Sequence, residues 1–300
     1  MAYKNILVTG ATGFIGKHLV HELSKPELRK KYNLIYFTRR PVQENFILGS
    51  LEDKNSLLTA TKDIDCVIHL AGETRSPNKY LNYMANVTGT KNLIEACRKN
   101  KVKRIIFIGT VNADLKKRGA YGESKKQAEE LVKNSYLDYV ILKLGMVYGP
   151  GDNQVSKTLG LVKKLPVIPI IGDGTKKIQP VYIEDVVGAI LACLEIKKFR
   201  KKIYNISGPY PITFNDYIQI ILDSLSLKRV KIHIPVFFIK LFLLLTGRAF
   251  RHIITFEIVD SITQNKEVDI RDAQHDLGFK PKEFKAMLPF LIHKKKMLDL

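Results

Sequence analysis

Tyr121 and Lys125 are the two residues whose types and spacing suggest chemistry most directly. They lie one helical turn apart in a stretch of helical composition, so both side chains fall on one face of a helix. A phenol, with an ordinary pKa of about 10, is a poor base near neutral pH. A neighbouring cation stabilises the phenolate, so we expect Lys125 to lower the pKa of Tyr121 and make it a general acid or base.

Thr110 is the third candidate for catalysis. It follows an apolar run at residues 104–108 (RIIFI) that is typical of a buried strand. The hydroxyl is therefore expected at the carboxyl edge of a sheet, where open α/β sheets bind ligands. From there it would orient a substrate alcohol or carbonyl toward Tyr121. A Tyr-x-x-x-Lys spacing also occurs on ordinary surface helices, so the catalytic interpretation depends on a cofactor site elsewhere in the chain.

A cofactor site is indicated by a glycine-rich segment near the start of the chain, VTGATGFIG. Gly10 permits a tight turn, Gly13 lets the backbone approach a pyrophosphate, and Gly16 allows a helix to pack closely on a strand. The N–H groups that open the helix would hold the phosphates. Because the segment lies between an apolar run and a helical stretch, it predicts dinucleotide binding rather than a merely structural turn.

The end of the second apolar run carries Arg39 and Arg40. An acidic residue there would bond the ribose hydroxyls of NAD. No Asp or Glu occurs from Lys30 to Gln43, however. Guanidinium groups form charge-assisted hydrogen bonds with a phosphate, so the pair favours NADP over NAD. The alternative is that both arginines simply face solvent.

The elements that position these residues follow from an alternation along the first half of the chain. Short apolar runs at residues 4–8, 34–37, 66–70, 104–108 and 139–144 alternate with amphipathic stretches such as 16–23, 86–98 and 124–133. This pattern is typical of βαβ units and of a parallel sheet buried on both faces. The predicted fold class is α/β, a Rossmann doubly wound parallel sheet with a smaller C-terminal α/β substrate domain.

Glycine and proline residues after Tyr148 mark a change of organisation. We expect the dinucleotide-binding Rossmann domain to comprise residues 1–155 and about 178–210. The substrate-binding domain would then comprise about 156–177 and 211–300, with the substrate in the cleft between the two.

The chain of 300 residues carries 49 Lys and Arg against 29 Asp and Glu, a formal net charge of +20. Hydrophobic residues make up 45%, enough to build a core, which argues against disorder. The charge is compatible with a solvated surface, with steering of anionic ligands, or with binding of nucleic acid or acidic lipid. Basic residues are spread along the chain without an RNA-recognition motif, so nucleic acid is not expected as a partner.

Three scattered cysteines without a CxxC spacing argue against disulfides and a thiolate metal site, and the histidines form no metal-binding pattern. The glycine-rich segment begins so early that it leaves no room for a signal peptide, and a reducing, cytoplasmic location is expected. The longest apolar run, residues 234–245 (IPVFFIKLFLLL), is too short to span a bilayer. We expect a buried or interface helix there rather than a membrane-surface one, and no membrane partner.

Together these residues resemble the extended branch of the short-chain dehydrogenase/reductase superfamily, the NAD-dependent epimerase/dehydratase family. The similarity covers nearly the whole chain. Beyond the glycine-rich segment and the Thr-Tyr-Lys set, the segments similar to the family's motifs are HLAG at residues 69–72, NVTGT at 86–90, VYGPGD at 147–152, GDG at 172–174 and VYIED at 181–185.

The resemblance implies a nicotinamide enzyme in which hydride moves between a substrate carbon and the cofactor. Tyr121 would exchange a proton with a substrate hydroxyl or ketone, Thr110 would hydrogen-bond the same oxygen, and Lys125 would hold the nicotinamide ribose. Family members often dimerise through a four-helix bundle, so a homodimer through residues 86–98 and 124–133 is expected. The implied cofactor contacts are Gly10, Thr12, Gly13, Phe14, Ile15, Gly16, Arg39, Arg40, Ser50, Leu51, Leu70, Ala71, Gly72, Asn86, Lys125 and Leu144.

Departures from the family pattern bear on the substrate. Ser50 stands where many members have an adenine-contacting Asp, with Asp53 nearby, and Lys143-Leu144 replace a usual Arg-Pro. Val111-Asn112 follow Thr110 where sugar dehydratases have Asp-Glu, so dehydration is disfavoured. Only ten residues separate Thr110 from Tyr121, which is short for a sugar epimerase and trims a wall of the substrate site.

The leading hypothesis is an NAD(P)-dependent epimerase or ketoreductase that acts on a nucleotide sugar or a related hydroxylated small molecule. The alternative is a non-catalytic NADPH-binding structural subunit resembling the accessory subunit of respiratory complex I. The short loop before Tyr121, the net charge and the apolar run at 234–245 suggest this second hypothesis. Turnover that depends on Tyr121 would distinguish the two.

Overall fold

The fold is described from a computed structural model of the chain. It describes residues 4–42, 45–74, 76, 78–196, 201–246 and 255–298, with side chains as far as residue 292.

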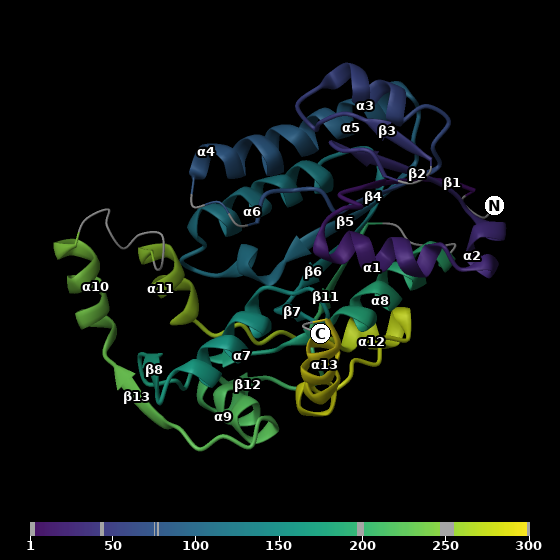
Figure 1. Cartoon of the computed structure of the whole chain (residues 1–300). Coiled ribbons are helices and arrows are strands. Elements are labelled where there is room, and N and C mark those ends of the chain that lie inside the picture. The colour runs from purple at the N-terminus through teal and green to yellow at the C-terminus, as the bar shows by residue number, and fades with distance from the viewer. Residues whose placement is uncertain are drawn as a thin grey trace.

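A seven-stranded parallel sheet forms the centre of the molecule (Figure 1). Its strand order is β11-β6-β5-β4-β1-β2-β3. This is the predicted doubly wound α/β sheet, in which the chain starts in the middle and moves outward in both directions. The strands are β1 (Asn5–Thr9), β2 (Asn33–Thr38), β3 (Phe46–Leu48), β4 (Cys66–His69), β5 (Arg104–Thr110), β6 (Asp138–Leu144) and β11 (Lys202–Ile206).

Helices cover both faces of this sheet (Figure 1). The central strand β5 is buried along its whole length, with Ile105 and Phe107 packed into one hydrophobic cluster and Ile106 and Ile108 into the other. This alternation explains why its sequence is apolar at nearly every position. One face carries α3 (Lys54–Ala60), α5 (Gly89–Lys99) and α6 (Gly119–Lys133); the other carries α1 (Phe14–Leu23), α2 (Pro26–Lys31) and α8 (Ile183–Glu195).

All seven strands end at the same edge of the sheet because they are parallel. Thr9 lies beside His69 there, and Thr110 lies beside Leu144. The chain order reverses between β1 and β4, which is the point where such sheets bind ligands. Short helical segments lead away from this edge: α4 (Lys79–Asn82), a π-helical turn at Tyr83–Thr88, and a 3-10 helix at Val111–Asp114.

The chain after β6 adds three two-stranded sheets and further helices below the central sheet in Figure 1. One hydrophobic cluster runs from the central strands into this part without a break. Phe284 joins them, with its ring 5.0 Å from that of Tyr148 and 5.2 Å from that of Tyr217. The elements are β7 (Val147–Tyr148), α7 (Gln154–Lys164), β8 (Val167–Ile171), β9 (Lys177–Ile178), β10 (Val181–Tyr182), β12 (Ile212–Thr213), α9 (Phe214–Ser224), β13 (Val230–Ile234), α12 (Arg271–Leu277) and α13 (Phe284–Leu298).

Two further helices, α10 (Val236–Leu245) and α11 (Phe256–Ile262), stand at one side of the molecule (Figure 1). Leu243 is the buried residue of α10, and most of its other large side chains are exposed. Of the two predicted alternatives, a buried helix or an interface helix, burial is therefore wrong for the described chain. Composition signals burial only when another element covers the helix. Among the described residues, no helix has the length and apolar character required to cross a membrane.

Candidate active site

The glycine-rich segment makes the turn that the sequence predicted. Gly10 adopts a φ of +78°, in the left-handed region that favours glycine, and a Cβ there would lie 2.6 Å from the amide nitrogen of Ala71. A Cβ on Gly16 would overlap the carbonyl oxygen of Gly10. The segment thus meets the end of β4 at the switch point of the sheet, and glycine is needed for that close approach.

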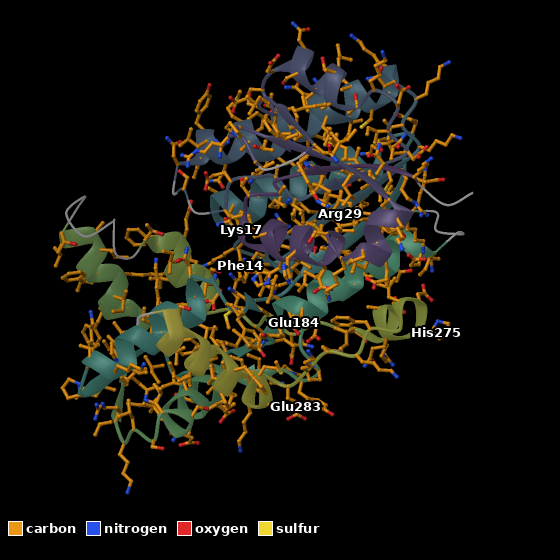
Figure 2. The ribbon with its side chains drawn as sticks, turned by 45° about the vertical axis from the view of Figure 1, so that its right-hand side comes forward. Phe14, Lys17, Arg29, Glu184, His275 and Glu283 are labelled. Carbon is orange, nitrogen blue, oxygen red and sulfur yellow. The ribbon has the colours of Figure 1, made fainter. Side chains whose placement is uncertain are left out.

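The start of α1 offers unpaired donors for an anion. Gly13 precedes the helix with no side-chain cap, and its own N–H bonds to the carbonyl of Gly10 at 3.0 Å. Among the described residues, the N–H groups of Phe14, Ile15 and Gly16 meet no acceptor. Figure 2 shows Phe14 and Lys17 at this same end of α1. Free N–H groups and a positive helix end suit a pyrophosphate, so these residues fit a dinucleotide.

A chain of hydrogen bonds fixes the segment beneath this loop. Thr90 Oγ1 lies 2.6 Å from the carbonyl of Asn86, which can only accept, so Thr90 donates there and accepts from Nε2 of His69 at 3.1 Å. Nδ1 of His69 then accepts from Thr9 Oγ1 at 2.7 Å, and Thr9 accepts from the N–H of Ala71 at 3.3 Å. Burial lowers the pKa of His69 to about 3, with the Lys125 charge adding to the effect. The ring is therefore neutral, with its proton on Nε2.

Asn86 connects this segment, the floor of the candidate cofactor site, to the helix that carries Tyr121. Its Oδ1 accepts from the N–H of Glu73 at 2.9 Å, and its Nδ2 donates to Ser124 Oγ at 2.9 Å. A Cβ on Gly72 would overlap Asn86 Oδ1, so glycine is required there as well. Asn86 lies in the π-helical turn Tyr83–Thr88, a distortion often found at functional sites. These bonds show Asn86 in a positioning role.

The three catalytic candidates come together at the carboxyl edge of β5. Thr110 ends the strand, is buried, and accepts from the N–H of Asn112 at 3.2 Å. Its hydroxyl also makes a hydrogen bond with the phenol of Tyr121, which lies in the first turn of α6. Lys125 lies one turn further along α6, as the spacing predicted. The geometry therefore places a hydroxyl, a phenol and an amine around one edge of the sheet.

Lys125 is buried in an apolar setting. Only 6% of the residue is exposed, and its Nζ lies 4.1 Å from the centre of the Phe107 ring. Burial lowers the pKa of Lys125 to about 7, although the carboxylate of Glu129 opposes the shift. The attraction between an ammonium and an aromatic face offsets part of the desolvation cost. Near neutral pH this amine is therefore only partly charged.

The pKa of Tyr121 moves in the direction opposite to that predicted from the sequence. Burial raises the pKa of Tyr121, and the hydrogen bond from Thr110 only partly counteracts it. Lys125, whose Nζ lies over the ring of Phe107, is not among the groups that shift the pKa of Tyr121. In the chain by itself, Tyr121 is thus a neutral phenol, which is suited to donating a proton.

The remaining cofactor candidates lie along the same edge. Arg39 and Arg40 follow β2 and are exposed, and neither guanidinium has an ion-pair partner in the described part of the chain. Ser50 and Leu51 lie between β3 and α3, where Asp53 caps α3 by accepting from the N–H groups of Asn55 and Ser56. Thr12 is exposed, Leu70 is half-buried, and Leu144 is buried beside Thr110. The Asp53 carboxylate therefore serves as the N-cap of α3.

A buried ion pair behind α6 was not predicted as part of the site. Lys143 Nζ lies 3.3 Å from Glu129 Oε2 and 2.5 Å from Asp114 Oδ2, and both Lys143 and Glu129 are almost completely buried. Glu129 also lies one turn beyond Lys125 on α6 and acts on its charge. Two signals pointed to it: the spacing from Lys125 to Glu129, and a lysine in an otherwise apolar strand.

Helix α11 and the residues just after it make hydrogen bonds to the short loop that leads to Tyr121. The sequence did not predict this contact. Glu257 Oε2 accepts from the N–H of Ala120 at 3.3 Å. Gln264 accepts from the N–H of Lys117 at 3.0 Å and donates to its carbonyl at 2.9 Å. Residues nearly 150 positions apart in the sequence thus meet beside the catalytic candidates, and no local pattern reports such a contact.

No set of three or more His, Cys, Asp or Glu side chains that could hold a metal ion occurs within the described ranges.

The chain is similar to known proteins over most of its length. The model of the NAD dependent epimerase/dehydratase family matches residues 6–207. UDP-glucose 4-epimerase of Vibrio cholerae is 27% identical over 308 residues, which cover 93% of this chain and 91% of that protein.

Two further relatives differ in the chemistry that their names state. The sterol-4-alpha-carboxylate 3-dehydrogenase (decarboxylating) of Mus musculus is 29% identical, covering 77% of this chain and 72% of that protein. Among solved structures, UDP-glucuronic acid 4-epimerase from Bacillus cereus, in complex with UDP-glucuronic acid and NAD, superposes with a TM-score of 0.75 at 24% identity. The match covers 96% of this chain and 97% of that one. This last likeness shows the fold.

Proposed function

Because the chain belongs to the NAD dependent epimerase/dehydratase family, we propose that it is a nicotinamide-dependent epimerase or ketoreductase that acts on a nucleotide sugar. The observation that carries this proposal is the grouping of Thr110, Tyr121 and Lys125 beside a glycine turn with free N–H donors. Relatives named as UDP-sugar epimerases support the substrate class. The comparisons give no support to a non-catalytic subunit.

The residues of this chain account for the proton chemistry. The glycine turn and the N–H groups that open α1 would hold a nicotinamide dinucleotide, which would supply or accept the hydride. Tyr121 Oη, as a neutral phenol, donates its proton to a substrate carbonyl oxygen, and Thr110 Oγ1 hydrogen-bonds the same oxygen. In the opposite direction Tyr121 Oη takes the proton of a substrate hydroxyl. That direction requires the phenolate, which a fully charged Lys125 stabilises.

Each residue of the cofactor site has a proposed contact. The N–H groups of Phe14, Ile15 and Gly16 hold the pyrophosphate, and Lys125 holds the nicotinamide ribose. Leu70, Ala71 and Gly72 lie beneath the cofactor, Ser50 and Leu51 border the adenine, and Thr12 and Leu144 complete the walls. Asn86 keeps the floor in register with α6.

The test of the catalytic proposal is the Tyr121→Phe variant. We expect it to lose turnover of UDP-sugars or of a ketone substrate while it still binds NADPH, because the phenyl ring retains the packing and lacks only the hydroxyl that exchanges the proton. The chain contains no Trp, so NADPH fluorescence can report binding with little interference. Tyr80→Phe, at an exposed tyrosine on α4, is the matched control. Unchanged turnover in Tyr121→Phe would sink the mechanism.

A preference for NADP is proposed from Arg39 and Arg40. Both are exposed at the end of β2 and have no acidic partner in the described residues, so they are free to pair with a 2′-phosphate. The variant Arg39→Ala/Arg40→Ala should weaken NADPH binding by roughly tenfold to a hundredfold. It should leave NADH binding nearly unchanged. An equal loss for both cofactors would count against the 2′-phosphate contact.

A dehydrogenase acting on a lipid alcohol or ketone is the second candidate function. The observation that favours it is the contact between α11, the neighbour of the exposed apolar helix α10, and the loop before Tyr121. A relative named as a sterol-carboxylate dehydrogenase fits this class. A panel that contains both UDP-sugars and hydroxylated or keto lipids separates the two candidates.

The arrangement of the chain is also a proposal. Residues 1–155 and about 178–210 form the cofactor-binding domain, and about 156–177 and 211–300 form the substrate-binding domain, with the substrate between them. We propose a homodimer through α5 and α6. Sedimentation velocity of the purified protein tests the dimer. Leu93 of α5 is fully buried, so it should not be chosen for a substitution that tests the interface.

A further inference from the structure

The outer face of α10 is entirely apolar and exposed. Phe237 is 68% exposed, Leu244 71% and Leu245 77%. We call the exposed side of the helix the α10 apolar face; its members are Phe237, Phe238, Leu241, Leu244 and Leu245. At 3.6 residues per turn, these five side chains cover one continuous sector of about 120° around the helix. A contiguous patch of this kind is uncommon on a soluble surface and marks an interaction site.

The opposite side of α10 faces the rest of the molecule. Leu243 is buried there, and Lys240 Nζ donates to Asp260 Oδ1 of α11 at 2.6 Å. In Figure 1, α10 and α11 stand together at the side of the molecule, away from the central sheet. The only charged side chain of the helix is thus turned inward and paired, while phenylalanine and leucine face outward. This is the reverse of an ordinary surface helix.

The sequence around α10 has a one-sided charge. No Asp or Glu occurs between Asp223 and Glu257. Lys228 and Lys231 lie just before α10, at and beside β13, and Lys228 is exposed. Exposed Val230 and Ile232 alternate with basic residues on β13. The Lys and Arg residues of this acid-free stretch are Lys228, Arg229, Lys231, Lys240, Arg248 and Arg251.

We propose that the α10 apolar face docks on an anionic lipid bilayer surface, with the helix lying in the interface rather than crossing it. Large apolar side chains within a basic, acid-free stretch of the chain are features that such surfaces bind, through burial of apolar area and attraction to acidic headgroups. A helix of ten residues is far too short to span. A second copy of this chain is disfavoured as the occupant of this face, because docking would bring two acid-free basic stretches together.

Vesicle cosedimentation tests the proposal with the full chain. We expect the protein to pellet with vesicles of phosphatidylcholine containing phosphatidylglycerol, to bind them less as salt is raised, and to bind pure phosphatidylcholine more weakly. The variant Phe237→Asp/Phe238→Asp should bind the anionic vesicles at least about tenfold more weakly. Tyr80→Asp, which alters a side chain that is 66% exposed on α4, should bind like the unmodified chain.

The absence of tryptophan from the sequence allows a site-specific reporter. In Phe238→Trp, the single indole should shift its emission to shorter wavelength on anionic vesicles, because the ring moves from water into the acyl boundary. In Tyr80→Trp the emission should stay where it was. Both substitutions lie at exposed positions, so neither disturbs a buried contact.

The outcomes that overturn the proposal are distinct. If the Phe237→Asp/Phe238→Asp variant binds anionic vesicles as well as the unmodified chain does, α10 is not the docking face. If no vesicle is bound, and sedimentation velocity shows self-association that this variant abolishes, a second copy occupies the face instead. Either result leaves the Tyr121 test untouched, because none of these substitutions alters the catalytic candidates.

Discussion

At the scale of single residues, burial decides the chemistry more than spacing does. Lys125 is a cation by type, yet its position over Phe107 and away from water leaves it only partly charged near pH 7. Tyr121 is likewise held as a neutral phenol. A ligand oxygen that accepts a hydrogen bond from the Lys125 ammonium, as the proposed ribose contact would, favours the charged amine and so the phenolate. Cofactor binding and proton transfer are therefore expected to be coupled through this one amine.

The low pKa of Lys125 predicts a pH-dependent stability. The folded pKa of about 7 lies below the ordinary 10.5, so the unfolded chain binds more protons between these values. The free energy of unfolding of the cofactor-free protein should therefore rise as pH is raised from about 7 toward 10. Below pH 7 the cost of holding Lys125 as a buried cation should be fully present. Lys125→Met should be more stable than the unmodified chain at pH 6, with the difference shrinking toward pH 10.

Urea unfolding across this pH range measures the effect. Lys266→Met is the matched control, because burial lowers the pKa of Lys266 to about 8 and its share of the rise should begin at higher pH. If the gap between Lys125→Met and the unmodified chain stays constant from pH 6 to pH 10, Lys125 is not the titrating group.

At the scale of elements, the turn between β1 and α1 depends on one glycine conformation. Gly10→Ala places a Cβ in a left-handed backbone, 2.6 Å from the amide of Ala71. We expect a loss of about 2–4 kcal/mol in the free energy of unfolding, together with weaker NADPH binding. In α7, Gly160→Ala meets nothing within 4 Å and should instead stabilise by roughly 0.5–1 kcal/mol. Thermal unfolding of the two variants side by side gives the comparison.

The ion pair behind α6 gives a second prediction at this scale. Lys143→Met leaves the Glu129 carboxylate buried, so the variant should lose about 3–5 kcal/mol in the free energy of unfolding. Adding Glu129→Gln to it removes the uncompensated charge and should recover most of the loss. Denaturant unfolding of both single variants and the double variant completes the cycle. Additive effects would mean that the two side chains do not interact.

How far the sequence could predict these elements depends on the range of the interaction. The strands β1, β2, β4, β5 and β6 were predicted because burial on both faces leaves a continuous apolar run. The strand β3 was not, since Phe46–Leu48 is short and half-exposed. The shared face of Tyr121 and Lys125 follows from helical periodicity, which is local.

What the sequence could not supply was the environment of those same residues. The direction of the Tyr121 pKa was predicted wrongly, because burial raises it and Lys125, whose Nζ lies over Phe107 of β5, does not offset that shift. For the apolar run of α10, the buried alternative was wrong because no described element packs over its outer face, and the interface alternative stays a prediction. Both errors arise where the decisive contact is tertiary.

At the scale of the whole molecule, one hydrophobic cluster joins the central sheet to the C-terminal segments. Tyr148, Tyr217 and Phe284 pack together across that junction. The proposed domains should therefore unfold as one cooperative unit, since neither can lose its partner without exposing this cluster.

Calorimetry should accordingly show a single transition, with equal calorimetric and van't Hoff enthalpies. Phe284→Ala removes the ring at the junction and should cost about 3–5 kcal/mol while leaving the transition single. Phe290→Ala, at an exposed position of the same helix, should cost little. Two resolved transitions in the unmodified chain would contradict the shared core.

The hydrogen bonds that α11 and Gln264 make to the loop before Tyr121 decide which substitutions this loop tolerates. Glu257 and Gln264 bind the backbone N–H and carbonyl groups of Lys117 and Ala120, which every residue type except proline can supply. The loop can therefore change its exposed side chain at Lys116 and keep these bonds, whereas the side chain of Lys117 also lies 3.8 Å from Asp260 Oδ1 of α11. A randomised library at Lys116 would vary the loop that leads to Tyr121 on a constant frame, and it tests whether this loop affects substrate selectivity.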